Sequence, residues 1–317
     1  MARRSSDVGR HAPVLLTPLI DALCHTPDGC YVDATFGRGG HSRALLERLS
    51  PAGRLIGLDR DSEAVREGER LAAQDGRFCI RHAAFADLDA VLDEAGWGAV
   101  HGIGFDLGVS SPQLDDAGRG FSFSHDGPLD MRMDTNNGQP LSQRLARLSE
   151  RELVEILRNF GNERYAGRIA RAILKAYTEG EMTRTSELEN VVFHAMPRQA
   201  RFGGAHPATR TFQALRMWIN DEIGQIEVGI KAAMRCLLPG GRLAVISFHS
   251  GEDRKVRDLI EEQVHPCTCP PDFPMCVCGR VASMRWVQKK PIRATDAEVA
   301  ENPRSRSALL RVAERLL

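Results

Sequence analysis

The sequence predicts an α/β fold, in which helices cover both faces of a parallel sheet and a terminal antiparallel hairpin closes it. Strand and helix signals alternate from residue 30 to residue 106. A purely helical pattern then runs from 141 to 196, and two strand-like segments end the chain. Strands that alternate with helices of this length are typical of a parallel sheet buried on both sides. The uninterrupted helical stretch predicts an insertion.

The alternating part is read from apolar runs bounded by turns and polar residues. Strands are predicted at 30–35, 53–59, 77–82 and 99–106, and helices at 42–50, 60–74 and 86–96. Ser42 is expected to open the first helix, and acidic residues begin the second, as the helix dipole prefers.

The alternation stops after the fourth strand. Residues 110–140 are rich in Gly, Pro, Asp and Ser and are too long for an ordinary connection in a compact domain. Aromatic residues, Met131 and Met133 favour an ordered loop over a linker. We therefore expect an α/β domain made of residues 1–135 and 206–317, with a helical insertion at 136–205.

The α/β pattern resumes after the insertion. A single long helix is predicted over 211–238, and a strand over 242–249 follows a Pro-Gly-Gly turn. The closing segments, 284–290 and 307–315, form the expected hairpin. Nicotinamide-binding domains normally finish with parallel strands, whereas class I methyltransferases finish their Rossmann-like sheet with a hairpin, so the ending favours the second architecture.

Composition sets broad limits on function. The 317 residues carry 42 basic and 42 acidic side chains, so the net charge gives no overall bias toward nucleic acid. The segment from Arg280 onward, however, has nine basic and four acidic residues. No apolar run approaches the length of a membrane span. The basic N-terminal segment contains an apolar stretch that is too short for a signal peptide. We expect a cytoplasmic protein whose cysteines are thiols or metal ligands rather than disulfides.

A glycine-rich turn follows the first strand, in the stretch YVDATFGRGGHS. Gly37, Gly39 and Gly40 allow positive φ and close approach of a ligand, although a tight turn without a ligand is the alternative. A dinucleotide fingerprint would place Gly or Ala where Ser42 stands. Asp59 ends the second strand, where a carboxylate binds the ribose diol of either NAD or S-adenosylmethionine. With Asp33 upstream, the set favours a nucleoside-type cofactor.

Further candidates follow later strands. Phe85 stands where an aromatic ring stacks on adenine, with an ordinary core Phe as the alternative. Asp106 ends the fourth strand and is expected to face the reaction centre, because parallel sheets hold ligands at their carboxyl ends. His249 and Ser250 follow a later strand, and a structural role is the favoured interpretation of this histidine.

Two other clusters carry chemistry. Arginines near the end of the insertion and in the basic tail predict a groove for phosphates, with ordinary surface arginines as the alternative: Arg198, Arg201, Arg210, Arg216, Arg304 and Arg306. Cys267, Cys269, Cys276 and Cys278 form two C-x-C pairs, tighter than the usual zinc spacing. A reduced, proline-stiffened surface loop is therefore the favoured interpretation, with one tetrahedral zinc ion as the alternative.

Several motifs together closely resemble the bacterial ribosomal RNA small-subunit methyltransferase H (MraW) family. They run in order from His11 to Arg311: HAPVLL, DATFGRGGHS, DLGVSSPQLDDAGRGFSFSHDGPLDMRMD, RYAGRIARAI, HPATRTFQALR, LPGGRLAVISFHS and NPRSRSALLR. The resemblance implies a class I S-adenosylmethionine-dependent fold with an inserted RNA-recognition domain. It also implies methylation of the exocyclic N4 of a cytidine in the decoding centre of 16S ribosomal RNA, with the small ribosomal subunit as partner.

Carried over by position, the family's cofactor contacts fall on seven residues: Gly39, Gly40, His41, Asp59, Phe85, Asp106 and Gln113. Gly251 replaces a common Leu, and Ala294-Thr295 replaces an expected Pro-Ser, which affects local loop geometry alone.

The expected mechanism needs no metal and no covalent intermediate. Asp106 positions the amine or the methionyl group, and the Ser110–Asp134 loop closes over an unstacked base. Two other classes stay open. Ser42 and the terminal hairpin disfavour a nicotinamide oxidoreductase, and the complete cofactor set disfavours a non-catalytic RNA-binding protein. The oligomeric state, monomer or dimer, is left open.

Overall fold

The computed structural model describes residues 13–180, 182–202, 204, 206–270, 275 and 277–316. The chain divides into two compact units. The sheet unit comprises Met1–Gly108 and Gly224–Leu317, and the helical unit comprises Val109–Ile223. The helical unit thus starts before the predicted insertion of 136–205 and ends after it.

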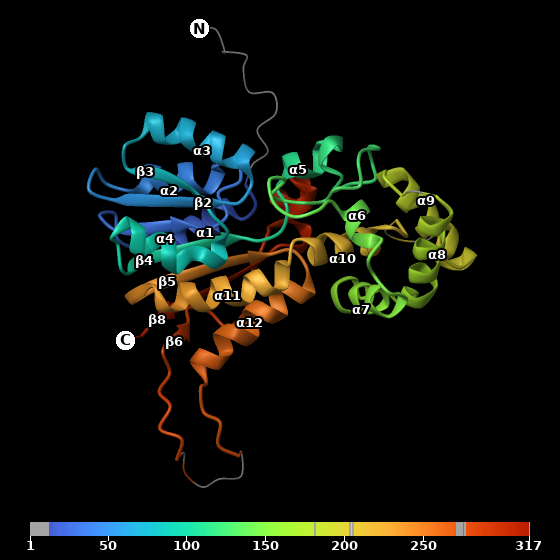
Figure 1. The fold of residues 1–317 in the computed structure, drawn as a ribbon. Helices are drawn as coiled ribbons and strands as arrows, with labels where there is room; N and C mark the ends of the chain where they lie inside the picture. The colour runs from blue at the N-terminus through green and yellow to red at the C-terminus, as the bar shows by residue number, and fades with distance from the viewer. Residues whose placement is uncertain are drawn as a thin grey trace. The chain divides into compact units, whose positions relative to one another are not determined.

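The sheet unit is built on one mixed sheet with the strand order β3-β2-β1-β4-β5-β8-β6 (Figure 1). Its parallel strands are β1 (Cys30–Asp33), β2 (Arg54–Asp59), β3 (Phe78–His82), β4 (Val100–Asp106) and β5 (Leu237–Ser247). The antiparallel end consists of β6 (Met284–Trp286), β7 (Ile292–Arg293) and β8 (Leu309–Arg315). The predicted α/β fold with a closing antiparallel pair is confirmed.

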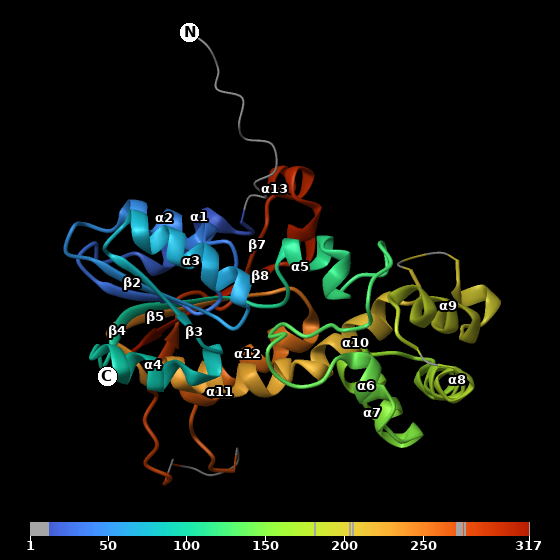
Figure 2. The same ribbon diagram turned by 45° about the horizontal axis from the view of Figure 1, so that its top comes forward.

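Helices cover both faces of this sheet (Figures 1 and 2). One face carries α1 (Leu16–Leu23), α2 (Gly40–Arg48) and α3 (Ser62–Gln74). The other face carries α4 (Leu88–Ala95), α11 (Glu222–Arg235) and α12 (Ser250–Val264). The core under the first three helices packs Leu19, Leu45 and Leu71 against strand residues. A short α13 (Asp296–Glu301) precedes β8. The sequence analysis did not predict α1, α12, α13 or β7.

The predicted single helix over 211–238 is wrong. The chain instead forms α10 (Thr209–Ile219) and α11, and Asp221 between them has a left-handed φ of 49°. The Asn220 side chain explains the break. It accepts a hydrogen bond from the Met133 N–H at 2.8 Å and donates to the Met131 carbonyl at 2.7 Å. Periodicity cannot show this, because the apolar pattern continues across the break.

The helical unit packs its helices around its own core. They are α5 (Ser111–Asp115), α6 (Leu141–Leu145), α7 (Glu150–Gly161), α8 (Ala166–Glu179), α9 (Thr185–Ala195) and α10. The long loop before α6 belongs to this core, since Phe121, Leu129, Met131 and Met133 are buried in it. The expectation of an ordered loop is therefore confirmed.

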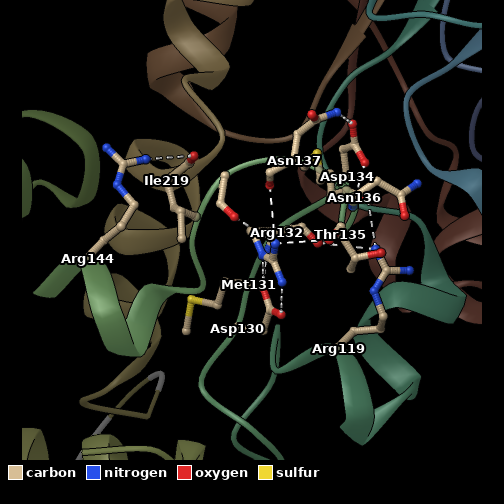
Figure 3. Close-up of polar contacts among 12 residues, drawn as sticks. Arg119, Asp130, Met131, Arg132, Asp134, Thr135, Asn136, Asn137, Arg144 and Ile219 are labelled. Carbon is tan, nitrogen blue, oxygen red and sulfur yellow. Dashed lines mark hydrogen bonds and ion pairs between the residues drawn. The ribbon is translucent and has the colours of Figure 1, made fainter.

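Two arginines fix the course of that loop (Figure 3). Arg132 forms a bidentate pair with Asp130 at 2.7 and 2.8 Å. Its guanidinium also donates to the carbonyls of Thr135, Asn137 and Gly138. Arg119 donates to the carbonyls of Arg132 and Met133. Bidentate, charge-assisted bonds to backbone and carboxylate hold a loop that has no regular structure of its own.

None of the helices in the described part of the chain combines the length and apolar character that crossing a membrane requires.

Candidate cofactor site

The glycine turn links β1 to α2, and its own geometry demands glycine. Gly37 and Gly39 have φ of 56° and 73°, in the left-handed region. A Cβ on Gly40 would lie 2.2 Å from the Pro13 ring. The helix begins at Gly40 with Gly39 as its N-cap. The prediction that Ser42 opens this helix is therefore wrong.

Ser42 instead serves the buried carboxylate at the end of β1. Its hydroxyl donates to Asp33 Oδ2 at 2.6 Å, and the Thr35 N–H donates to Asp33 Oδ1 at 3.3 Å. Burial raises the pKa of Asp33 above its usual value, while His41 and these hydrogen bonds oppose the rise. A glycine at position 42 would leave Asp33 without its closest donor. The departure from the dinucleotide fingerprint thus has a structural cause.

Asp59 ties the end of β2 to the glycine turn. Its carboxylate accepts the N–H of Gly37 at 2.8 Å and the N–H of Asp61 at 2.8 Å. Burial raises the pKa of Asp59 to about 6, and the two backbone hydrogen bonds oppose this rise. Each carboxylate oxygen has two lone pairs, so both oxygens keep capacity for a ribose hydroxyl.

Asp106 ends β4 and has different surroundings. Its N–H donates to Thr35 Oγ1 at 2.6 Å, which fixes the backbone. Its Oδ2 lies 3.8 Å from His41 Nδ1. Among the described residues, Oδ1 is buried and has no hydrogen-bond partner. Burial raises the pKa of Asp106 to about 6, His41 lowers it, and the carboxylates of Asp33 and Glu252 raise it further.

His41 is held by the segment before α1. Its Nε2 lies 3.0 Å from the Val14 carbonyl, an acceptor that requires a proton on this nitrogen. Nδ1 is then the atom that faces Asp106. Thr35 and Glu252 were missed by the sequence analysis. Thr35 lies two residues after the end of β1, so its place near a strand end was the available signal.

Phe85 begins a short 3₁₀ turn after β3. Its ring packs edge-on against Phe105 with centroids 5.6 Å apart. Gly229 of α11 leaves room for this ring, because a Cβ there would lie 2.6 Å from Phe85 Cδ2. The side chain is only partly buried. The ring is therefore fixed in orientation, and its stacking on adenine stays a prediction.

These residues fit S-adenosylmethionine. The unpartnered Asp106 Oδ1 suits an ammonium or amine donor, because buried carboxylate oxygens normally have a hydrogen-bond partner. Asp59 would take the ribose. S-adenosylmethionine contains no pyrophosphate, so the turn around Gly39 and Gly40 does not need the dinucleotide-binding fingerprint.

Gln113 belongs to the helical unit. It is buried, and its Oε1 accepts the Ser110 N–H at 2.9 Å in a capping box at the start of α5. Its role as a cofactor contact stays a prediction. His249 caps α12, because its Nδ1 accepts the Glu252 N–H at 3.3 Å. This contact agrees with the structural role favoured for His249, and Ser250 is the first residue of α12.

The six arginines predicted to bind RNA fall into two groups. Arg201 donates to the carbonyls of Met196 and His194, and Arg216 forms a bidentate pair with Glu222 at 2.7 and 2.8 Å. These two guanidinium groups hold the helical unit together. The exposed members are Arg198 and Arg210 in the helical unit, and Arg304 and Arg306 before β8 in the sheet unit.

Comparisons with known proteins identify the family of this chain. A family model described as the MraW methylase family matches residues 9–316. The chain is 49% identical over 318 residues to "Ribosomal RNA small subunit methyltransferase H" of Halorhodospira halophila, covering 100% of this chain and 97% of the relative. It is 47% identical over 307 residues to the protein of the same name from Symbiobacterium thermophilum, covering 96% of each.

A third relative of that name, from Nitrosococcus oceani, is 48% identical over 312 residues and 98% of each chain is covered. The match extends through both units rather than through the glycine turn alone. The chain belongs to the MraW methylase family, with a class I methyltransferase fold and S-adenosylmethionine as its cofactor.

Proposed function

We propose that this protein methylates the exocyclic N4 of a cytidine in the decoding centre of 16S ribosomal RNA. The names of its relatives support small-subunit ribosomal RNA as substrate. The observation that carries the choice of an amine is the buried, unpartnered Oδ1 of Asp106 at the end of β4. An oxygen in that state is suited to accept a hydrogen bond from an amino group.

Methylation of a cytosine amine requires that the enzyme position or activate the nitrogen. The N4 lone pair of cytosine is delocalised into the ring, so this nitrogen is a weak nucleophile. When bound, S-adenosylmethionine supplies an electrophilic methyl group on a positively charged sulfur. Asp106 Oδ1 would accept an N4 hydrogen and orient the remaining electron pair toward that methyl group. Its pKa of about 6 keeps Asp106 ionised at neutral pH, yet more basic than an exposed carboxylate.

The remaining residues would either bind the cofactor or orient Asp106. Asp59 would bind the ribose hydroxyls, and Phe85 would stack on the adenine. Gly39, Gly40 and His41 would border the methionyl end. His41 positions Asp106, because its Nδ1 faces Oδ2 at 3.8 Å and leaves Oδ1 for the amine. Gln113 is assigned to the cofactor by the family resemblance.

RNA recognition is assigned to the helical unit. From Arg198 to Arg216 the chain carries four arginines and no Asp or Glu. Phe202 lies within this segment and is 75% exposed. It packs edge-on against Phe193 with centroids 6.3 Å apart. An exposed aromatic ring among arginines is suited to stack on an unpaired base beside phosphates. Arg304 and Arg306 would add contacts from the sheet unit.

Complementation tests the function directly. Small-subunit RNA from a bacterial strain that lacks its own enzyme of this family would be digested and mapped by mass. We expect this chain to restore one methyl group on one decoding-centre cytidine, at N4. Methylation at another base, or at a carbon or ribose oxygen of the cytidine, would contradict the proposal. An Asp93→Asn variant, altered at an exposed carboxylate of α4, serves as the matched control.

Salt dependence tests the assignment of RNA binding separately. Increasing salt should weaken RNA binding steeply and cofactor binding little, because phosphate contacts release counterions. Equal salt slopes for the two ligands would contradict a basic RNA surface distinct from the cofactor site.

A further inference from the structure

A loop between α12 and β6 brings three cysteine sulfurs together. The Sγ atoms of Cys267, Cys269 and Cys278 all lie within 4.8 Å of one another. The Sγ atoms of Cys267 and Cys278 are 3.8 Å apart. The two C-x-C pairs of the sequence therefore converge, at least in these three members. The catalytic proposal uses none of them.

The separation of the sulfurs fits two ligands of one metal ion and is too long for a disulfide. A disulfide requires sulfurs about 2.0 Å apart. Two thiolates on one tetrahedral zinc ion, each with a Zn–S distance of about 2.3 Å, are separated by about 3.8 Å. The observed distance between Cys267 and Cys278 equals the second value. In addition, the Val277 N–H donates to Cys269 Sγ at 3.4 Å, a contact that stabilises a thiolate ligand.

We propose that Cys267, Cys269 and Cys278 bind one Zn²⁺ as thiolates. Each thiol loses its proton to solvent when it binds. The sequence analysis had kept zinc as the alternative to a reduced loop. Cys276, the other member of the second C-x-C pair, lies outside the described residues. Sulfur-rich tetrahedral sites select zinc among the available divalent metals.

The loop needs such a crosslink because it has little core. Met275, Val277 and Val281 are 76%, 71% and 80% exposed. Segments that bury so little apolar surface are commonly held by a metal or a disulfide. A single zinc ion would join the chain leaving α12 to the chain approaching β6.

The zinc site is structural rather than catalytic. α12 starts just after β5 ends, at the carboxyl ends of the parallel strands, where Asp59 and Asp106 lie. β6 starts at the opposite side, at the amino ends of the parallel strands, because Met284 pairs with Arg315 at the end of the antiparallel β8. The cysteine loop connects the far end of α12 to that opposite side (Figure 1). The metal is thus separated from the cofactor residues by the length of the strands.

Metal analysis of the purified full-length chain tests the proposal. We expect about one equivalent of zinc per chain. Cobalt loaded in its place should show the intense visible bands of tetrahedral thiolate coordination. Cys267→Ser and Cys278→Ser should each lose the metal. Cys24→Ser, at a partly buried cysteine outside the loop, should retain it.

The readouts are independent of methyl transfer, so failure here leaves the proposed function standing. Protein that contains no zinc and takes up none when zinc is added would overturn the proposal. So would iron in place of zinc, or a Cys267–Cys278 disulfide found by mass spectrometry of non-reduced protein. Limited proteolysis gives a further check, since chelation should expose the loop to cleavage while calorimetry shows unchanged cofactor affinity.

Discussion

The carboxyl ends of β2 and β4 each carry an aspartate, and the two aspartates differ in what surrounds them. Burial raises the pKa of both Asp59 and Asp106 to about 6. Asp59 accepts two backbone N–H groups, from Gly37 and Asp61. Asp106 has His41 at 3.8 Å from Oδ2, and its Oδ1 has no hydrogen-bond partner in the described part of the chain.

The difference teaches how one residue type takes two roles at one edge of a sheet. A carboxylate fixed by backbone donors is a rigid acceptor and is suited to holding a ligand. A carboxylate with one oxygen left open is suited to the group that arrives with the substrate. Pairs of acids whose environments differ commonly divide chemical work in this way. We therefore assign cofactor binding to Asp59 and action on the amine to Asp106.

Replacing Asp106 should have the largest effect. Asp106→Asn removes the charge and the basicity of the carboxylate while keeping the shape, and it replaces one accepting oxygen with an NH₂ donor. We expect the rate of methyl transfer to fall about 100-fold or more, the usual scale for a positioned acid or base. Cofactor affinity, measured by calorimetry, should change far less than the rate. Retained activity with unchanged affinity would remove Asp106 from its central role.

Replacing Asp59 should affect binding instead. Asp59→Ala removes the ribose acceptor and leaves the N–H groups of Gly37 and Asp61 without it. Losing charge-assisted hydrogen bonds of this kind costs about 1.5–3 kcal/mol, so the Kd for S-adenosylmethionine should rise roughly 10- to 100-fold. Asp61→Asn is the matched control, because Asn caps a helix as well as Asp does. An unchanged Kd would show that Asp59 does not hold the cofactor.

Ser42 sharpens the comparison from the structural side. Ser42→Ala removes the hydroxyl that donates to Asp33 at 2.6 Å. Leaving this buried carboxylate short of a donor should lower the free energy of unfolding by about 1–3 kcal/mol, seen as a lower Tm. Ser50→Ala breaks a hydrogen bond to Asp28 at the surface and should cost much less. Equal losses for the two variants would contradict a supporting role for Ser42.

The pH dependence of stability tests the surroundings of Asp106 without methyl transfer. Asp106 binds a proton more tightly in the folded chain, with a pKa of about 6 against an ordinary value of 3.8. Its contribution to stability is therefore complete below pH about 4 and is lost as the pH rises to about 6. The wild type should lose more free energy of unfolding across that interval than Asp106→Asn does. Equal losses of free energy of unfolding for the two proteins across that interval would contradict the raised pKa of Asp106.

The sheet was predictable because its signals are local. Apolar runs, glycine turns and helix-starting acids place β1 to β4 close to their observed bounds. The break between α10 and α11 was not predictable, because it depends on Asn220 binding the loop at Met131 and Met133. Those partners lie far away in the sequence, and no local pattern reports them.

The residues of the candidate site could be predicted from the sequence, but the contacts between them could not. Position at strand ends was enough to single out Asp59 and Asp106. It could not show that Ser42 serves Asp33, or that His41 faces Asp106, since both contacts depend on how α2 packs. Whether the four cysteines could share a metal was not predictable for a related reason. The spacing of C-x-C pairs says nothing about whether the pairs converge, and the structure brings Cys267 beside Cys278.

The most direct test of the divided roles is single-turnover methyl transfer at saturating S-adenosylmethionine. Small subunits from the deletion strain are the substrate, and Asp59→Ala is compared with Asp106→Asn. We predict that saturation restores Asp59→Ala close to the wild-type rate, while Asp106→Asn stays about 100-fold slower. Equal rates for the two variants at saturation, or rescue of Asp106→Asn by added cofactor, would contradict the account.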